Sequence, residues 1–494
     1  MFITVVLSFH LQNQSKDQPE AGRSNRPGHI DPNLGAVPRK DYLLSLLPEY
    51  TKDALGVTTD NNPNASLVMT PLPFAMLSPQ AKAFAWTIND PIFDSYEPWK
   101  LQQRFALACF YYATGGETSW NSRENWLSYN PNVWEEHWFS KTYPTPDHHW
   151  ISWHSLYPLV VEEPSQEFNH LWLIQNGLQG TLPPELFLLT SLRSLDLTLN
   201  PLLGGTIPSE IGNLHRMEIL MFLDSTMTGE LPTELGQLSN LLGLYAQSNY
   251  FHGGIPSQVS LLQDLIVLDL ASSNLSGPIP SELGLISPLG IWLEENELDS
   301  HIPTEIGLTK TQLLSIHGNL LTGTIPSQLG MLLDDPWLYK DKYATLMEKK
   351  APKVGVDFVL DIVVHVLDVG FTGVMMHQNL LTGSIPTELG TFSEGEVLNL
   401  AQNSLTGAIP SELGLLSNLL WLGLSENQLS GQIPSEVGLL SNLKYLLLHQ
   451  NPLTGLLPDL GSLVSHGNLG GITINATGIT VRDFVAVTGV HVLA

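Results

Sequence analysis

The feature that most constrains the fold is the unit LxxLxLxxNxLxGxIPxxLGxL, which recurs with a period of 24 residues. It is clearest in NSLTGAIPSELGLLSNLLWLGLSEN, from Asn403, and in NQLSGQIPSEVGLLSNLKYLLLHQN, from Asn427. No single unit can bury its own leucines, so a chain built this way folds as a stack of similar coils. Its Asn position can be followed through twelve units: Asn176, Asn200, Ser225, Asn249, Ser273, Asn296, Asn319, Asn379, Asn403, Asn427, Asn451 and Thr477.

Each part of the unit has a local conformation that its residues favour. The alternating LxL is typical of a half-buried strand, and strands of successive units would pair in parallel. The Asn at the following corner can satisfy backbone groups left open there. Gly then permits a tight bend, and Pro keeps the residue before it extended. The run SELGLLSNL predicts a short helical turn. We therefore expect an α/β solenoid with a parallel β-sheet on its concave face and short helical turns on its convex side.

The unit resembles the plant-type leucine-rich repeat, which is marked by LTGxIPxxLGxL. Receptor-like-kinase ectodomains, polygalacturonase-inhibitor-like proteins and many microalgal proteins carry this repeat. The resemblance covers roughly residues 166–480. It implies a right-handed superhelix and an extracellular or cell-surface binding role, but it names no ligand. The sequence contains no kinase signature.

The regions outside the repeats differ in composition. Residues 1–76, rich in Pro, Asn, Asp and Ser, are expected to form a mostly disordered leader with a short LLSLL segment. Residues 77–165 are expected to form a helical N-terminal cap, with helices over 78–89 and 99–113. Related caps usually carry a cysteine pair, whereas this chain has Glu136 and His137 in that area. Residues 166–480 form the predicted solenoid, and residues 481–494 an irregular C-terminal tail.

The repeat is interrupted at residues 334–370. Asn319 and Asn379 lie 60 residues apart, whereas one unit would separate them by 24. The added segment includes the lysine-rich stretch WLYKDKYATLMEKKAPK. One interpretation is an island that leaves the solenoid and builds a ligand pocket. The other, which we favour, is an unselected insertion such as intron-derived sequence.

Composition excludes some partners. The formal net charge is −27, so binding to nucleic acid or to an anionic membrane surface is disfavoured. Cys109 is the one cysteine, so neither an intrachain disulfide nor a cysteine metal site can form. No apolar run is long enough for a transmembrane segment. The apolar start MFITVVLSF is either a weak signal or a frayed terminus.

Candidate binding residues lie six, four, two and one positions before each Asn, where the repeat places side chains on the concave face. None of these positions holds Lys or Arg. Carboxylates with aromatic rings suit a cationic peptide or a carbohydrate, although drift at solvated positions is the alternative. The predicted ligand-binding residues are Trp172, Tyr245, Asp269, Trp292, Glu294, Glu295, His317, His377, Trp421, Glu426, Tyr445 and His449, and Asp196, Asp224 and His170 share the same face.

Two histidine groups raise further alternatives. His317 and His377 would be neighbours if the interruption loops out cleanly, and could then share a metal or sense pH, although we favour solvated histidines. The cap segment holds His137, Asp147, His148, His149 and His154 among tryptophans, where aromatic packing is favoured over a metal site.

No catalytic motif is present, and no cofactor is predicted. The sequence thus predicts a non-enzymatic recognition module for a protein, peptide or glycan ligand. A structural or adhesive cell-covering protein is the alternative, and a metal-dependent enzyme using the cap histidines is the least favoured.

Overall fold

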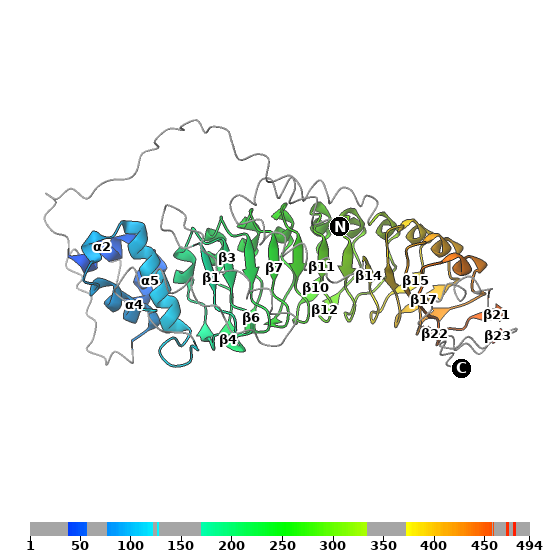
Figure 1. Ribbon diagram of the computed structural model, residues 1–494, viewed down its shortest axis with the longest axis horizontal. Helices are drawn as coiled ribbons and strands as arrows, with labels where there is room; N and C mark the ends of the chain where they lie inside the picture. The colour runs from blue at the N-terminus through cyan, green and yellow to red at the C-terminus, as the bar shows by residue number, and fades with distance from the viewer. Residues whose placement is uncertain are drawn as a thin grey trace, which may run out of the picture.

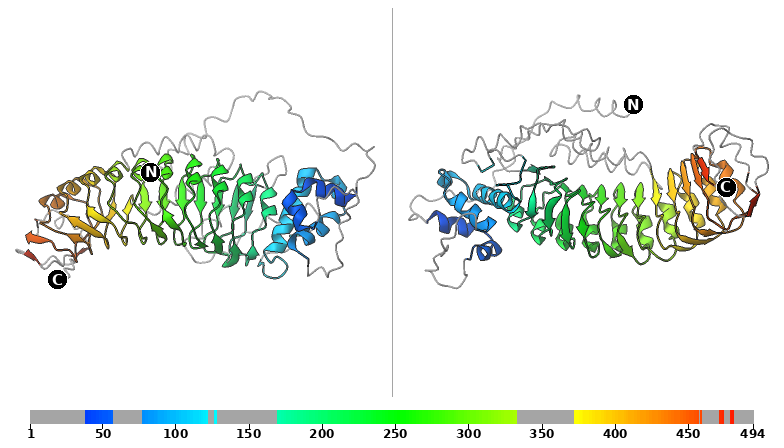
Figure 2. Two further views of the ribbon diagram at one scale, coloured as in Figure 1. Left: turned by 180° about the vertical axis from the view of Figure 1, so that it is seen from behind. Right: turned by 90° about the horizontal axis from the view of Figure 1, so that it is seen from below.

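The structure is a computed structural model that describes residues 38–56, 77–121, 126–127, 169–332, 372–456, 458, 471–473 and 478–480. These residues form a helical unit at the N-terminal end, followed by a long, curved stack of coils (Figures 1 and 2). Stacked coils are the architecture that the 24-residue period predicts. The predicted tail, the interruption at 334–370 and the cap histidines lie outside the described residues.

The N-terminal unit contains the two helices expected from the sequence. Helix α4 (Pro79–Ile88) begins with Pro79 in its first turn, and the Ser78 side chain accepts a hydrogen bond from the Ala81 N–H at 3.1 Å. Helix α5 (Pro98–Ala113) follows the short 3-10 helix η2 (Phe93–Ser95) and ends before Gly115, whose φ is +78°. The two helices pack directly against each other.

One expectation for the leader is wrong over residues 38–56. This stretch forms helix α2 (Arg39–Leu46) and helix α3 (Glu49–Ala54). Leu43 and Leu47 are buried in the same hydrophobic core as α4 and α5. The LLSLL segment therefore supplies residues to the hydrophobic core. The local composition, rich in Pro, Asn, Asp and Ser, did not predict this. The rest of the predicted leader lies outside the described residues.

A buried carboxylate joins the helical unit to the first coil. Glu185 is completely buried in η3 (Pro184–Leu188), the first 3-10 helix of the array. Its carboxylate accepts hydrogen bonds from Thr51 Oγ1 at 3.0 Å and from Gln80 Nε2 at 3.1 Å. Helices α3 and α4 are thus held against the array, as expected of a cap that covers the end of a solenoid.

The long sheet has 12 parallel strands, one from each predicted unit (Figure 1). Each strand pairs with that of the next unit in an unbroken register; for example, Leu398 lies opposite Leu422. In order, the strands are β1 (His170–Trp172), β3 (Ser194–Asp196), β5 (Ile219–Met221), β7 (Gly243–Tyr245), β9 (Val267–Asp269), β11 (Gly290–Trp292), β13 (Leu313–Ser315), β14 (Gly373–Met375), β16 (Val397–Asn399), β18 (Trp421–Gly423), β20 (Tyr445–Leu447) and β22 (Gly471–Thr473).

The other two sides of most coils are a short second strand and a 3-10 helix, while the coil that begins with β13 has the 3-10 helix but no second strand among its described residues. In Figure 1 the 3-10 helices run along the upper edge and the second strands along the lower edge. The second strands are β2 (Gln179–Thr181), β4 (Leu202–Gly205), β6 (Thr226–Gly229), β8 (Tyr250–Phe251), β10 (Ser276–Pro278), β12 (Glu297–Asp299), β15 (Thr382–Ser384), β17 (Ser404–Gly407), β19 (Gln428–Leu429), β21 (Thr454–Leu456) and β23 (Gly478–Thr480). The 3-10 helices after η3 are η4 (Ser209–Asn213), η5 (Thr233–Gln237), η6 (Ser257–Leu261), η7 (Ser281–Leu285), η8 (Thr304–Leu308), η9 (Ser327–Met331), η10 (Thr387–Thr391), η11 (Ser411–Leu415) and η12 (Ser435–Leu439).

The recurring Asn side chains hold successive coils together. Asn427 Nδ2 donates to the carbonyl oxygens of Leu424 and Ser425 in its own coil and of Leu400 in the preceding coil, at 3.0–3.2 Å. Its Oδ1 accepts from the Leu405 N–H at 3.0 Å. At Ser273 this network shrinks to a single long bond, from Oγ to the Ala271 carbonyl at 3.4 Å. We conclude that the Asn position is a structural corner and faces no ligand.

The register also continues across the interruption. Strand β13 pairs directly with β14, which places Ser315 opposite Met375. Asn379 Nδ2 donates to the Ile316 carbonyl of the preceding coil at 3.0 Å. The described residues on either side of 334–370 therefore behave as consecutive units, as expected if the interruption loops out.

Candidate functional site

The strand register separates a core face from a concave face. In β18, Leu422 is completely buried in the main hydrophobic core, whereas the neighbouring Trp421 is half-buried on the opposite face. In β11, Ile291 lies in the main core, whereas Trp292 packs against a second, separate cluster. The predicted binding residues therefore do not point into the main core.

The second cluster covers the middle of the concave face. We call it the central concave cluster. Its residues come from the strands β5, β7, β9 and β11 and from the position just before three of them: Ile219, Leu242, Tyr245, Ile266, Val267 and Leu289, with Met221, Leu223 and Trp292 packed against it. The aliphatic residues of this cluster were not among the predicted binding residues, which are aromatic, acidic or histidine. Their position relative to the Asn would have identified Ile219, Met221, Leu223 and Val267.

Two aromatic rings of this cluster lie flat over glycines of their own strands. A Cβ added to Gly290 would stand 2.1 Å from the Trp292 ring, and one added to Gly243 would stand 2.6 Å from the Tyr245 ring. A glycine six residues before the Asn thus makes room for the ring of an aromatic residue four residues before the same Asn. Tyr245 is only 3% exposed, so this predicted contact residue acts as packing in the described structure.

A buried carboxyl group lies beside the central concave cluster. Asp269 is 6% exposed, and burial raises its pKa to about 8, with Glu294 and Asp224 adding to the rise. The Ala271 N–H donates to Asp269 Oδ1 at 3.2 Å and opposes the shift. Burial also raises the pKa of Glu294. At neutral pH the middle of the face therefore carries less negative charge than its sequence suggests.

Replacing Asp269 with Asn is expected to stabilise the protein at alkaline pH. Between roughly pH 4 and pH 8 the folded chain holds a proton at Asp269 that the unfolded chain releases, so the free energy of unfolding falls as pH rises. Asp269→Asn keeps the acceptor for Ala271 and removes this cost, which from the raised pKa is as much as about 6 kcal/mol at pH 8.5 and shrinks toward pH 4. Denaturant unfolding across this range measures it, with the exposed Asp299→Asn as the matched control. Equal stabilities at pH 8.5 would show that Asp269 is not buried as described.

His317 and His377 meet as predicted, each two residues past the end of the adjacent strands β13 and β14. Their rings stack with centroids 4.1 Å apart and planes 11° apart. His317 Nδ1 lies 3.0 Å from Ser315 Oγ, and His317 Nε2 lies 4.0 Å from Glu295 Oε1. Burial lowers the pKa of both rings, that of His377 to about 4 with His317 contributing. Both rings are therefore neutral at pH 7, and each can donate or accept a hydrogen bond.

This histidine group offers little for catalysis or metal binding. Ser315 is completely buried, so its hydroxyl cannot reach a substrate although it contacts an imidazole. Among the described residues, no group of three or more His, Cys, Asp and Glu side chains could hold a metal ion. The described residues thus provide no third ligand for a metal ion shared by His317 and His377.

The most accessible group of predicted residues lies near the C-terminal end of the concave face. We call Trp421, Glu426, Tyr445 and His449 the C-terminal concave cluster. The Trp421 and Tyr445 rings, on neighbouring strands, have centroids 4.7 Å apart and planes tilted by 41°. Glu426 Oε1 lies 3.9 Å from His449 Nε2 and accepts a hydrogen bond from Gln402 Nε2 at 3.2 Å. Tyr445 is 39% exposed, more than any other aromatic residue predicted to bind.

Two polar groups at this end of the face differ in their accessibility. Trp421 Nε1 is buried and donates to no acceptor among the described residues. The Glu426 carboxylate is partly exposed and lies on the same face. Trp172, at the other end of the sheet, differs because its Nε1 already donates to Ser194 Oγ at 2.6 Å. The predicted residues therefore divide into separate groups along the described part of the face.

Comparisons with known proteins agree with this architecture. Residues 191–214 match the Leucine Rich Repeat family. The crystal structure of a TDR receptor is 26% identical with a TM-score of 0.50, over 64% of this chain and 52% of that one. The plant peptide hormone receptor RGFR1 in complex with RGF2 is 27% identical with a TM-score of 0.51, over 64% of this chain and 48% of that one.

These matches are partial. The aligned part spans about half the length of each receptor structure. No curated protein matches the chain. Among the described residues, no helix has both the length and the apolar character needed to cross a bilayer.

Proposed function

Because the chain is a leucine-rich-repeat protein whose array is similar to plant receptor ectodomains, we propose that it is a recognition module for a cationic, extended peptide segment. The binding surface is the concave face, with the C-terminal concave cluster at its centre. The observation that carries the proposal is the half-buried Trp421 ring packed against the exposed Tyr445 ring, on the face that also carries the partly exposed Glu426 carboxylate. The similarity to a receptor that was solved with RGF2 supports a peptide ligand.

Electrostatics favour a cationic ligand. Residues 169–332 carry 15 acidic and three basic side chains, and residues 372–456 carry six and one. A ligand Lys or Arg can pair with Glu426 and pack its alkyl stem on the Trp421 and Tyr445 rings.

A glycan is the second candidate. Sugar rings stack on aromatic side chains, and the paired rings of Trp421 and Tyr445 offer such a surface. Gln402 and Glu426 could bond sugar hydroxyls at its edge. A glycan ligand would bind with little dependence on salt, whereas a cationic peptide would lose affinity as salt rises.

The test measures the affinity of the full chain for defined probes. These are a peptide of alternating leucine and lysine, its leucine–glutamate counterpart, and chito- and cello-oligosaccharides. We expect the lysine peptide to bind, and the Trp421→Ala/Tyr445→Ala variant to bind it at least tenfold more weakly, about 1.4 kcal/mol. Trp99→Ala and Tyr250→Ala remove aromatics that are 38% and 55% exposed outside this face, and should change nothing.

The outcomes separate the candidates. Salt-sensitive binding that is lost with Glu426→Lys but kept with Glu436→Lys supports a cationic peptide on this face. Salt-insensitive binding of an oligosaccharide would replace the peptide with a glycan. Wild-type affinity in the Trp421→Ala/Tyr445→Ala variant would overturn the site altogether.

We further propose that the protein works outside the cell or at the cell surface and without catalysis, as the receptor ectodomain similarity suggests. The alternative of a structural or adhesive protein predicts retention in a cell covering without a selective ligand. The metal-dependent enzyme would depend on cap histidines that lie outside the described residues, and chelation would abolish its activity.

A further inference from the structure

A row of exposed leucines runs along the 3-10 helices, away from the concave face. Each stands at the end of its helix, and together they form the leucine ridge: Leu261, Leu285, Leu308, Met331, Leu415 and Leu439. Their exposed fractions run from 38% at Met331 to 68% at Leu285. Helices η6 to η9 are consecutive neighbours, so the first four ridge residues form one continuous apolar strip.

The ridge is confined to part of the array. The same position holds Asn213 and Gln237 in the first two coils after η3, and Thr391 in η10. The fold therefore accepts a polar residue there and does not itself require leucine. Six solvent-exposed apolar side chains in the later coils call for an explanation outside folding, because contiguous exposed apolar strips on soluble proteins usually mark contact sites.

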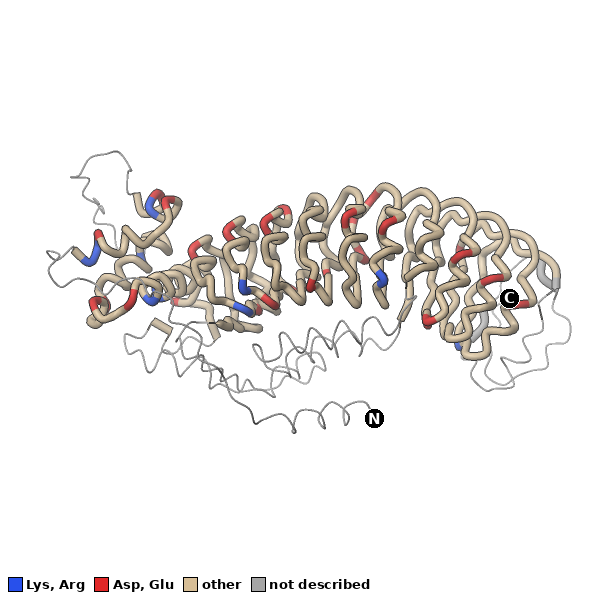
Figure 3. Tube along the Cα trace, turned by 90° about the horizontal axis from the view of Figure 1, so that it is seen from above, with Lys and Arg blue, Asp and Glu red and all other residues tan. Residues whose placement is uncertain are grey.

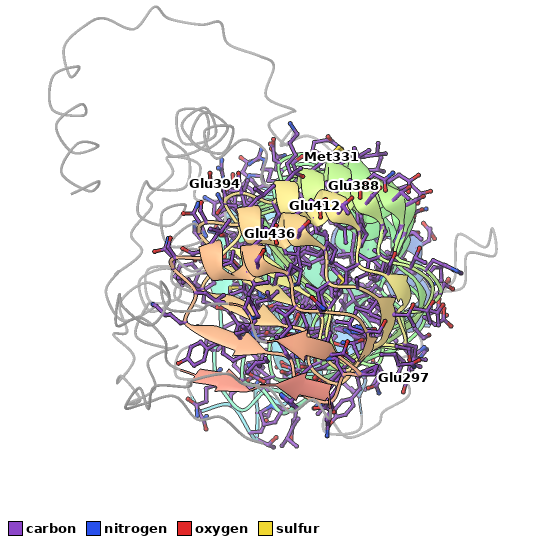
Figure 4. The ribbon with its side chains drawn as sticks, turned by 90° about the vertical axis from the view of Figure 1, so that its right-hand side faces the viewer. Glu297, Met331, Glu388, Glu394, Glu412 and Glu436 are labelled. Atoms are coloured by element: carbon purple, nitrogen blue, oxygen red, sulfur yellow. The ribbon has the colours of Figure 1, made fainter. Side chains whose placement is uncertain are left out.

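Carboxylates lie beside part of the ridge, three residues before the last residue of η7, η8, η10, η11 and η12, whereas η6 and η9 have Gln258 and Gln328 at this position. Figure 4 shows Glu388, Glu412 and Glu436 along successive helices, with Met331 close by. The preceding Ser or Thr hydroxyl donates to each carboxylate; for example, Ser435 Oγ donates to Glu436 Oε2 at 3.0 Å. Acidic positions recur along the whole array in Figure 3, while basic positions are few.

From this arrangement we infer that the leucine ridge binds a basic amphipathic helix of a partner protein. Successive coils are spaced by about 4.8 Å at the sheet, close to the roughly 5.4 Å of one helical turn. One apolar residue per turn can thus meet one ridge residue per coil. Lys or Arg on the flank of the partner helix then faces Glu282 and Glu305, the carboxylates of η7 and η8 beside the continuous strip.

The charges argue against other occupants. A second copy of the chain would bring its own Glu row against this one, which is repulsive at neutral pH. An anionic lipid surface is repelled in the same way. A basic amphipathic helix can pack its apolar residues on the leucine ridge and pair its basic residues with the adjacent carboxylates. This surface is independent of the proposed concave site.

The inference is tested with a 21-residue peptide of leucine and lysine whose leucines repeat at heptad positions a and d. The alternating leucine–lysine peptide presents no apolar helical face and is proposed to bind the concave face, so it is the control probe whose affinity the ridge variants should leave unchanged. We expect the helical peptide to bind the full chain, more weakly at high salt. Leu285→Ser/Leu308→Ser, and separately Glu282→Lys/Glu305→Lys, should each weaken binding at least tenfold.

Matched controls guard against non-specific loss. Leu202→Ser/Leu320→Ser removes leucines that are 65% and 49% exposed outside the ridge, and should leave helix binding unchanged. Circular dichroism confirms that each variant remains folded. The inference is overturned if the helical peptide fails to bind, if the control pair weakens binding equally, or if the chain self-associates through the ridge and Leu285→Ser/Leu308→Ser abolishes that. Trp421→Ala/Tyr445→Ala should not affect helix binding, which separates this result from the concave-site test.

Discussion

Asn427→Ala is expected to lower the free energy of unfolding by about 3 kcal/mol, because it removes four hydrogen bonds at a buried corner. The Leu405 N–H loses its acceptor, and the Leu400 carbonyl loses the donor that joins two coils. Stability in a repeat array is largely a sum of such nearest-neighbour contacts, so the loss should weaken one interface without abolishing the others. Denaturant unfolding with hydrogen exchange on the flanking coils measures it.

The chain offers controls for this prediction. Asn418 is exposed and makes one side-chain bond, from Nδ2 to the Ser393 carbonyl at 3.0 Å, so Asn418→Ala should cost well under 1 kcal/mol. Conversely, Ser273→Asn restores the usual residue at a corner with few side-chain hydrogen bonds. It should raise the free energy of unfolding by about 1 kcal/mol. If Asn427→Ala and Asn418→Ala cost the same, the corner network does not hold the coils together.

The second large effect lies in the helical unit, where Asp90→Asn is expected to cost about 3 kcal/mol or more. Arg104 and Asp90 form an ion pair at 2.7 Å, with side chains 1% and 0% exposed. The guanidinium lies 4.8 Å from the Trp86 ring centroid and 5.0 Å from that of Tyr96. Asp90→Asn keeps the side-chain shape but leaves a buried cation facing a neutral amide.

A double-mutant cycle isolates this pair. Asp90→Asn combined with Arg104→Met removes both charges and should cost less than the sum of the single changes. The exposed pair of Arg39 and Asp94 is the matched control, and Asp94→Asn should cost at most about 1 kcal/mol. Hydrogen exchange on α4 and α5 during unfolding reports on the helical unit, because tryptophans lie both there and in the array. Additive single changes would show that Asp90 and Arg104 are not coupled.

The solenoid could be predicted from the sequence because its information is local and repeated. Each unit predicts the same strand, corner and helical turn. The strand register of one coil therefore fixes the register of its neighbours. Helices α4 and α5 were predictable because Ser78–Pro79 and the apolar spacing of α5 are local signals. Helix α2 was missed because Leu43 and Leu47 become core residues only by packing against distant helices.

The candidate site was less predictable for a physical reason. Position in the repeat gives the face on which a side chain lies, but not how deeply it is buried. Tyr245 and Tyr445 occupy concave positions, yet Tyr245 is 3% exposed and Tyr445 is 39% exposed. The difference arises from lateral packing of aliphatic side chains such as Ile219 and Val267, which no single unit encodes.

The central claim is that the concave face at β18 and β20 receives the ligand, and thiol labelling tests it most directly. Cys109 is completely buried and burial raises its pKa, so it should not compete with an introduced thiol. Leu447→Cys places a reporter between Tyr445 and His449. Saturating alternating leucine–lysine peptide should slow its labelling at least tenfold and leave a Leu202→Cys reporter unaffected. Unchanged labelling at Leu447→Cys under saturation would contradict the account.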